Sequence, residues 1–187
     1  MPTCHWSYIS KIIDTIVAKQ PNSILDIGVG NAKWGSLCRE YLEVYGHNYW
    51  KKENWKRKID GVEIYEPYLT PQTRHYYNTI FNQDIVQLLK HNQLPIYDCI
   101  IMCDVLEHLV KEDGIFVLNE LQKIGKTVIL AVPIGNWLYT FDGDNDKESH
   151  ISMWEKDEFL LNGLKKQNYY PVYGKEIGLF IYENTII

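Results

Sequence analysis

The sequence predicts an α/β fold in which a mainly parallel sheet carries helices on both faces and ends in an antiparallel hairpin. First, short continuous apolar runs alternate with longer segments of helical pattern, which is typical of parallel strands buried on both sides. Second, the first apolar run breaks into a glycine turn at 28–30. Third, two β-rich runs close the chain around Gly174. Because 187 residues suffice for one hydrophobic core, we expect 1–187 to form a single domain.

The first predicted element is an amphipathic helix that ends before Pro21, and it rests on apolar residues at helical spacing: Ile9, Ile12, Ile13, Ile16 and Val17. Parallel strands are expected at 23–28, 59–64, 78–81, 97–103 and 126–132, with helices between them at 32–45, 84–91 and 111–124. A last helix is expected near 155–166. Strands at 169–174 and 177–187 then form the hairpin, which brings the sheet to seven strands.

Two segments, 45–58 and 135–154, do not fit the alternation of strands and helices. The first is polar, aromatic and locally basic, and the second is acidic and aromatic. Both are long for loops of a compact domain, and loops of this length are often functional lids.

The charge balance favours a small polar ligand over a polyanion. The chain has 19 basic and 24 acidic side chains and a formal net charge of −5. This balance provides no general attraction to a phosphate backbone or to anionic lipid. We therefore expect no nucleic-acid partner and no membrane partner, and we interpret the basic run at 51–58 as a solvated loop.

The cysteines and the N-terminus indicate a soluble protein of the cytoplasm. The four cysteines contain no C-x-x-C pair, which favours reduced thiols. No apolar run is long enough to span a bilayer, and the first residues lack the pattern of a secretion signal.

The glycine turn at 28–30 predicts a ligand site. In an open α/β sheet, ligands bind beyond the carboxyl ends of the strands, where this turn must lie. Glycines let the backbone bend tightly and approach a ligand, and the following helix offers unpaired N–H groups. A phosphate loop is excluded because the G-x-x-x-x-G-K-[ST] pattern is missing. A nicotinamide fingerprint needs a small residue where Lys33 stands, which disfavours an oxidoreductase without closing that alternative.

The remaining pattern, D-x-G-x-G-x-A from Asp26 to Ala32, resembles the class I methyltransferases that use S-adenosylmethionine. The string DVLEHL at 104–109 resembles the fourth motif of their small-molecule branch. The resemblance implies a Rossmann-like methyltransferase fold and S-adenosylmethionine as cofactor. By motif order, the residues implied beside the cofactor are Asp26, Gly28, Val29, Gly30 and Asn31 at the methionine portion, Glu63 at the ribose, Asp84 and Ile85 at the adenine, and Cys103 and Asp104 at the methyl-donor end.

Some of these residues have a second interpretation. Asp84 is equally suited to cap the helix that follows it. His108 and His150 are the candidates for a catalytic base, since an oxygen acceptor must lose a proton. The implied reaction is methyl transfer to an oxygen or nitrogen atom of a small molecule or glycan precursor. Aromatic residues are candidates for the acceptor pocket, although in a fold of this kind they lie in the core at least as often. They are Trp34, Trp137, Tyr139 and Trp154.

Two alternatives concern the same residues. Asp104, Glu107 and His108 share one face if they lie on a helix turn, and with His150 they offer two oxygens and two imidazoles to a divalent ion. This set resembles that of metal-dependent O-methyltransferases that act on small-RNA ends or on quinone precursors. The other alternative is a non-catalytic module that binds S-adenosylmethionine and serves a partner.

Overall fold

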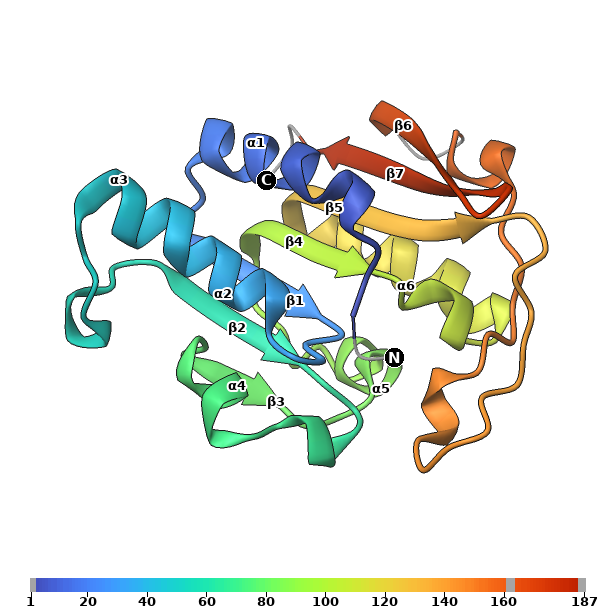
Figure 1. Ribbon diagram of the computed structural model, residues 1–187, viewed down its shortest axis with the longest axis horizontal. Coiled ribbons are helices and arrows are strands. Elements are labelled where there is room, and N and C mark those ends of the chain that lie inside the picture. Colours follow the sequence, from blue (N-terminus) through green and yellow to red (C-terminus); the bar gives the residue numbers. More distant parts are fainter. Residues whose placement is uncertain (1–2, 161–163, 185–187) are drawn as a thin grey trace.

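The computed structural model describes residues 3–160 and 164–184, and its centre is a seven-stranded sheet of order β3-β2-β1-β4-β5-β7-β6. The first five strands run parallel, and β7 pairs antiparallel with both β5 and β6. The strands are β1 Ser23–Ile27, β2 Lys58–Val62, β3 Thr79–Phe81, β4 Tyr97–Cys103, β5 Gly125–Ile134, β6 Leu164–Val172 and β7 Lys175–Glu183. This arrangement, drawn in Figure 1, confirms the predicted fold class.

Helices cover both faces of the sheet, as the continuous apolar strands predict. The α-helices are α1 Ile9–Lys19, α2 Lys33–Arg39, α3 Tyr45–His47, α4 Pro71–His75, α5 Ile85–Lys90 and α6 Lys111–Ile124. A π-helical turn, η2 Glu40–Val44, joins α2 to α3. The 3₁₀ turns are η1 Trp6–Tyr8, η3 Lys52–Asn54, η4 Glu66–Tyr68, η5 Leu106–His108, η6 Asp146–Glu148 and η7 Lys156–Phe159.

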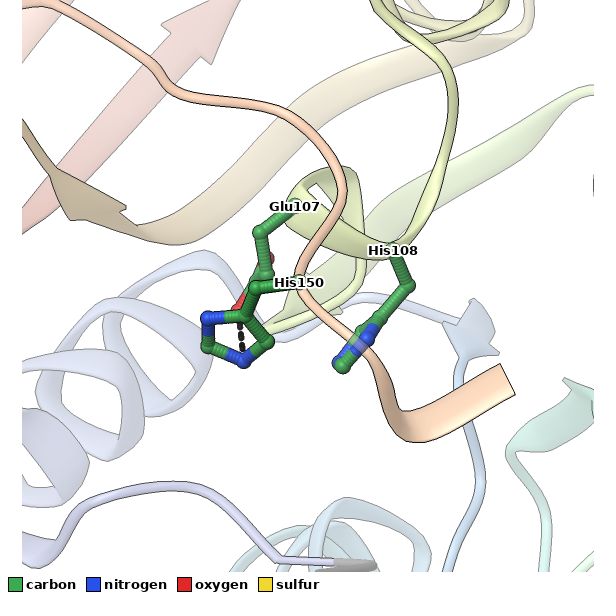
Figure 2. A group of neighbouring side chains, drawn as sticks. All are labelled: Glu107, His108 and His150. Atoms are coloured by element: carbon green, nitrogen blue, oxygen red, sulfur yellow. Dashed lines mark ion pairs between the residues drawn. The ribbon is translucent and has the colours of Figure 1, made fainter. Parts of the chain in front are cut away.

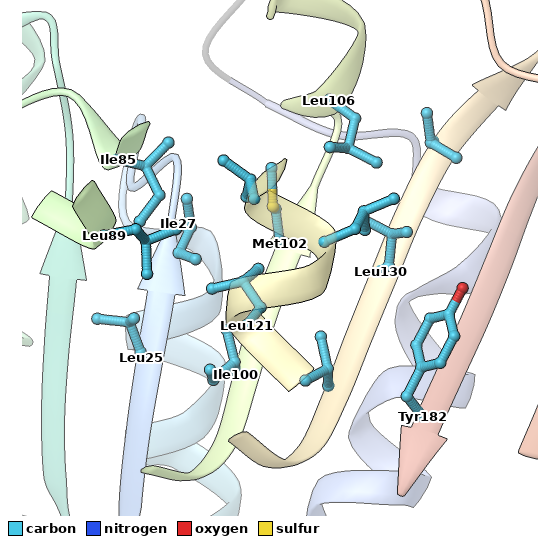
Figure 3. Packing of buried hydrophobic residues seen from close by; sticks show 14 of the residues in the cluster. Leu25, Ile27, Ile85, Leu89, Ile100, Met102, Leu106, Leu121, Leu130 and Tyr182 are labelled. Carbon is cyan, nitrogen blue, oxygen red and sulfur yellow. The ribbon is translucent and has the colours of Figure 1, made fainter. Parts of the chain in front are cut away.

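Each face of the sheet has its own hydrophobic core because successive strand residues point to opposite sides. Leu25 and Ile27 of β1 pack with α5 and α6, as Figure 3 shows. Ile24 of the same strand packs with α1 and α2. Burial on both sides makes the central strands a rigid support for the loops at their carboxyl ends.

The helix expected near 155–166 is wrong for the residues that the structure describes. Only the short turn η7 is helical, strand β6 begins at Leu164, and residues 161–163 lie outside the described part. The reason is that β6 is an edge strand that pairs with β7 alone. Lys166 and Gln167 are exposed on it, so the apolar pattern of a strand is missing. The turn to β7 is Tyr173-Gly174, both with positive φ, which suits a two-residue hairpin.

The 45–58 segment is folded onto the helices rather than free to act as a lid. The carboxylate of the fully buried Glu43 accepts the backbone N–H groups of Lys56 and Arg57 at 2.8 and 2.6 Å. Its ion pair with the buried Arg39 is 3.3 Å long, and the Arg39 guanidinium lies over the Trp55 ring. The segment therefore supports the start of β2.

Within the described residues, no helix combines the length and the apolar composition needed to cross a membrane.

We predict that Glu43→Ala lowers the free energy of unfolding by about 3 kcal/mol, because it leaves Arg39 buried without its anion and frees two backbone donors. Urea denaturation followed by circular dichroism measures the loss. Glu40→Ala, an exposed glutamate of the same π-helical turn, is the control and should change stability by less than about 0.5 kcal/mol. Equal losses in the two variants would contradict the assigned role of Glu43.

Candidate active site

The turn after β1 has a backbone that only glycine suits at its first position. Gly28 has a φ of +82°, and a Cβ there would lie 2.5 Å from Cγ2 of Val105. The N–H of Gly30 donates to Oε2 of Glu63 at 2.8 Å. The turn is thus closed against the loop after β4 on one side and fixed to the end of β2 on the other.

A cavity of about 320 Å³ lies at the carboxyl ends of the central strands. Four separate segments that the sequence singled out meet in its wall. The predicted cofactor residues that line it are Gly28, Val29, Gly30, Glu63, Asp84, Ile85, Cys103 and Asp104. The candidate base His108 also lines it, whereas the 45–58 segment does not.

Asp26 and Asn31 are not among the residues that line the cavity. Asp26 is buried in the core, on the face covered by α1 and α2, where it accepts a hydrogen bond from the Tyr77 hydroxyl. That hydroxyl in turn accepts the N–H of Gly35 in α2, so Asp26 helps to hold α2 against the sheet. Burial raises the pKa of Asp26 to about 7. Asn31 is exposed.

Asp84 lies where both of its expected roles, helix cap and cavity residue, are met. It is the N-cap of α5, with its Oδ1 accepting the N–H of Val86 at 2.8 Å. It also lines the cavity beside Ile85.

Further residues of the cavity wall were missed by sequence reasoning, namely Cys4, Lys33, Tyr68, Asn145 and Glu148. Lys33 at the start of α2 donates to the carbonyl of Cys4 at 2.6 Å, and Tyr8 donates to Asp104 at 2.8 Å. The N-terminal segment is therefore tied to the cavity rim. Lys33 carried a signal, because it lies three residues after Gly30, at the start of the helix that follows the glycine turn. Tyr68 ends the 3₁₀ turn η4 and Glu148 ends the 3₁₀ turn η6, and neither residue belongs to a sequence pattern.

Glu107, His108 and His150 form a cluster beside the cavity (Figure 2). One ligand atom from each lies within 4.8 Å of the others. His108 Nδ1 is 3.0 Å from the carbonyl of Ser149, and His150 Nδ1 is 3.1 Å from that of Trp137. Because a carbonyl only accepts, both Nδ1 atoms carry the proton. Each Nε2 therefore keeps its lone pair.

The electrostatics of this cluster favour neutral imidazoles. Burial lowers the pKa of His108, and burial together with the neighbouring His108 lowers the pKa of His150 to about 4. Burial, with repulsion from Asp104, raises the pKa of Glu107 well above its usual range. Neither carboxylate oxygen of Glu107 has a hydrogen-bond partner among the described residues, although His150 Nε2 lies 3.8 Å from one of them.

Asp104 does not join this cluster. The expected helix turn over 104–108 is only the 3₁₀ turn η5 from Leu106, and Asp104 precedes it with a φ of +53°. Its carboxylate instead accepts the Tyr8 hydroxyl, and burial raises its pKa. The shared face that the spacing suggested is therefore absent for Asp104.

The aromatic candidates are divided between core and loop. Trp154 is fully enclosed in the core, and Trp34 is 4% exposed at the cavity wall. Trp137 and Tyr139 belong to the 135–154 segment, and the Tyr139 ring lies 4.4 Å from that of His150. Tyr139 is the one of the four that is both exposed and next to a candidate base.

No protein-family model and no curated protein sequence matches the chain. Solved structures do match. The magnesium protoporphyrin IX methyltransferase ChlM of Synechocystis PCC 6803 with bound S-adenosylhomocysteine superposes with a TM-score of 0.61 at 18% identity, over 92% of this chain and 80% of that one.

Two further structures match nearly whole chains. A S-adenosylmethionine-dependent methyltransferase from Archaeoglobus fulgidus has a TM-score of 0.62 at 16% identity, with 94% of each chain covered. The N-methyltransferase NodS from Bradyrhizobium japonicum WM9 has a TM-score of 0.60 at 10% identity, over 95% of this chain and 96% of that one. The fold is therefore that of the class I methyltransferases, as the sequence motifs predicted.

We predict that Asp26 makes the protein less stable as the pH rises. Its pKa in the folded state, about 7, exceeds its ordinary value of 3.8. Its contribution to stability is therefore complete below pH 3.8 and is lost as the pH rises to 7, at about 1.4 kcal/mol per pH unit. Asp26→Asn removes this dependence. Urea denaturation of both proteins between pH 5 and pH 8 should show a flatter profile for the variant.

Asp14→Asn on α1 is the control, because Asp14 is exposed. Parallel profiles for wild type and Asp26→Asn would contradict the prediction.

Proposed function

We propose that the chain is a S-adenosylmethionine-dependent methyltransferase that acts on an oxygen or nitrogen atom of a small molecule or glycan precursor. One observation supports this most. The glycine turn, the acid after β2, the acid after β3 and the DVLEHL segment all meet at a single cavity, in the order implied by the family motifs. The fold, and neighbours solved with S-adenosylmethionine or S-adenosylhomocysteine bound, add to it. We take 1–187 as a single domain, and its free thiols favour a cytoplasmic location.

The charges around the cavity suit such a cofactor. Glu63 is the acid at the end of β2, where a carboxylate can accept the hydroxyls of a ribose. Asp84 and Ile85 together offer an acceptor and an apolar surface for an adenine. At the other end, Lys33 and Asp104 carry opposite charges, which match the carboxylate and the ammonium group of an amino acid. When the cofactor binds, Lys33 would give up its hydrogen bond to the Cys4 carbonyl and donate to the carboxylate of the amino acid instead.

S-adenosylmethionine, when bound, supplies an electrophilic methyl group on a sulfonium. The protein must then align the acceptor and, for an oxygen acceptor, take up its proton. His108 lines the cavity with a free Nε2 lone pair, and the Ser149 carbonyl fixes its tautomer and orientation. His150 is held in the same way by Trp137. Both stay neutral at pH 7, as a base requires.

We predict that the purified protein binds S-adenosylhomocysteine and that Glu63→Ala weakens binding at least about tenfold, the effect of losing one charged hydrogen bond. Lys33→Met should weaken S-adenosylhomocysteine by about tenfold but leave 5′-methylthioadenosine, which lacks the amino-acid portion, unchanged. Isothermal titration calorimetry with both ligands measures these constants.

Exposed residues outside the cavity provide the controls: Glu66→Ala for the acid and Lys51→Met for the lysine. Failure of the wild type to bind either ligand would overturn the proposed function. Equal losses of both ligands in Lys33→Met would overturn the role given to Lys33 alone.

The cluster of Glu107, His108 and His150 favours one second candidate, a metal-dependent O-methyltransferase. Two free Nε2 atoms and a buried carboxylate without hydrogen bonds are a suitable ligand set for a divalent transition metal. Ligand atoms bound about 2.1 Å from one ion in a tetrahedron lie about 3.4 Å apart, so side chains whose ligand atoms lie within 4.8 Å of one another must close by up to about 1.4 Å. In this candidate the ion would orient an acceptor hydroxyl and lower its pKa.

For this candidate, we predict that Mn²⁺ binds the wild type and that Glu107→Gln weakens its binding at least about tenfold, because an anionic ligand becomes a neutral amide. Calorimetric titration with Mn²⁺ alone tests this. His91→Ala, an exposed histidine at the end of α5, is the control and should bind as the wild type does. Unchanged affinity in Glu107→Gln would remove the metal-dependent candidate and leave methyl transfer with a histidine base.

A further inference from the structure

The 135–154 segment, called the strap below, runs along the cavity and is attached firmly at its base. A bridge pairs Gly135 with Trp154, and another pairs Tyr139 with His150. The carbonyl of Glu107 accepts the N–H groups of Ile151 and Ser152 at 2.8 and 3.1 Å. The base of the strap is therefore part of the folded core.

The tip of the strap is joined to the opposite wall of the cavity through Tyr68. This tyrosine ends η4, just beyond β2, and its hydroxyl donates to Glu148 at 2.9 Å. The amide nitrogen of Asn145 donates to the same hydroxyl at 3.3 Å. The partners are about 80 residues apart in the sequence, and all three line the cavity. Asn145 and Glu148 are 5% and 8% exposed.

This closure lies next to Glu63, the acid that we assign to the cofactor ribose. The charge of Glu148 is close enough to add to the rise in the pKa of Glu63 that burial causes. A ligand that reaches Glu63 therefore lies beside the contact between Tyr68 and the strap. Between the described residues, two hydrogen bonds join Tyr68 to the strap, one of them to a carboxylate. Breaking them opens this edge locally and does not require the protein to unfold.

The strap also holds the candidate bases. Ser149 follows Glu148 directly, and its carbonyl fixes Nδ1 of His108. His150 is the next residue, and its own Nδ1 is held by Trp137, at the other end of the strap. Release of the tip would therefore loosen the Ser149 carbonyl and, with it, the imidazole of His108, whereas His150 stays within the attached base of the strap.

We propose that Tyr68 is a positioning residue that fastens the strap across the cavity, so that one closure both retains the cofactor and sets His108 for the acceptor. This inference rests on the proposed methyltransferase function. It implies that cofactor enters while the strap is released and that the acceptor meets a complete site only after the strap has closed.

Stopped-flow fluorescence with S-adenosylhomocysteine tests the inference. Tyr68→Phe removes the hydroxyl and should raise both the association and the dissociation rate about tenfold, the effect of about 1.4 kcal/mol on a barrier. A merely structural contact would raise the dissociation rate alone. Glu148→Ala should behave like Tyr68→Phe, whereas Glu148→Gln keeps an acceptor and should stay near the wild type. Tyr65→Phe is the control, because it removes the hydroxyl of a neighbouring tyrosine, and it should leave both rates unchanged.

Hydrogen exchange without ligand gives a second measurement. Peptides that cover 139–151 should exchange several times faster in Tyr68→Phe than in the wild type, while peptides of α1 should not change. If the wild type binds S-adenosylhomocysteine but the variant's rates and exchange are unchanged, the inference is wrong and the proposed function stands. If the wild type binds no S-adenosylhomocysteine, the proposed function fails, and the inference fails with it.

Discussion

The hydrogen bond from the Gly30 N–H to the Glu63 carboxylate is the constraint on which the geometry of the cavity depends. It joins the turn after β1 to the end of β2, two strands that already share a parallel register from Ser23 to Ile27. Without it, the glycines that permit the turn would also permit many other conformations. One carboxylate thus fixes a flexible stretch of backbone through one oxygen and accepts the N–H of Tyr65 at 2.9 Å through the other, and the residue also lines the cavity. The cavity takes its shape from this bond together with the contact between Gly28 and Val105.

Several carboxylates around this site are buried at a cost that only the surrounding packing can offset. Asp26, Asp104 and Glu107 are each raised in pKa chiefly by burial. Transfer of a carboxylate out of water is unfavourable unless hydrogen bonds replace the solvent, and Glu107 has none among the described residues. Acids with a shifted pKa are common at functional sites, because catalysis often needs a side chain whose pKa differs from its value in water. The two hydrophobic cores hold the strands rigid enough to keep these acids in place.

The sequence predicted what periodicity and glycine chemistry control. The parallel strands and the hairpin follow from apolar runs, and a ligand site follows from the turn at 28–30. The other three segments at the cavity were implied by the resemblance to the class I methyltransferases. It failed where local pattern and environment disagree. The exposed edge strand β6 has the composition of a helix surface, so its start was misassigned. Asp104 was placed on a helix because its spacing to Glu107 fits one, but a positive φ turns it toward Tyr8. Tyr68 and Glu148 meet through tertiary contact alone, and neither carries a local signal.

These successes and failures follow a physical division within the site. The segments proposed for the cofactor follow strands, where backbone geometry is dictated by the sheet and leaves a readable motif. The residues proposed for the acceptor side depend on the strap, whose carbonyls at Trp137 and Ser149 orient His150 and His108. Backbone carbonyls are present at every residue, so this orientation needs a loop conformation rather than particular side chains. The strap can therefore vary in sequence and still hold the two imidazoles. Under the proposed function, its exposed side chains, among them Leu138 and Tyr139, are candidates for contact with the acceptor. Under the proposed function, base orientation thus depends on main-chain atoms of the strap, and contact with the acceptor depends on its side chains.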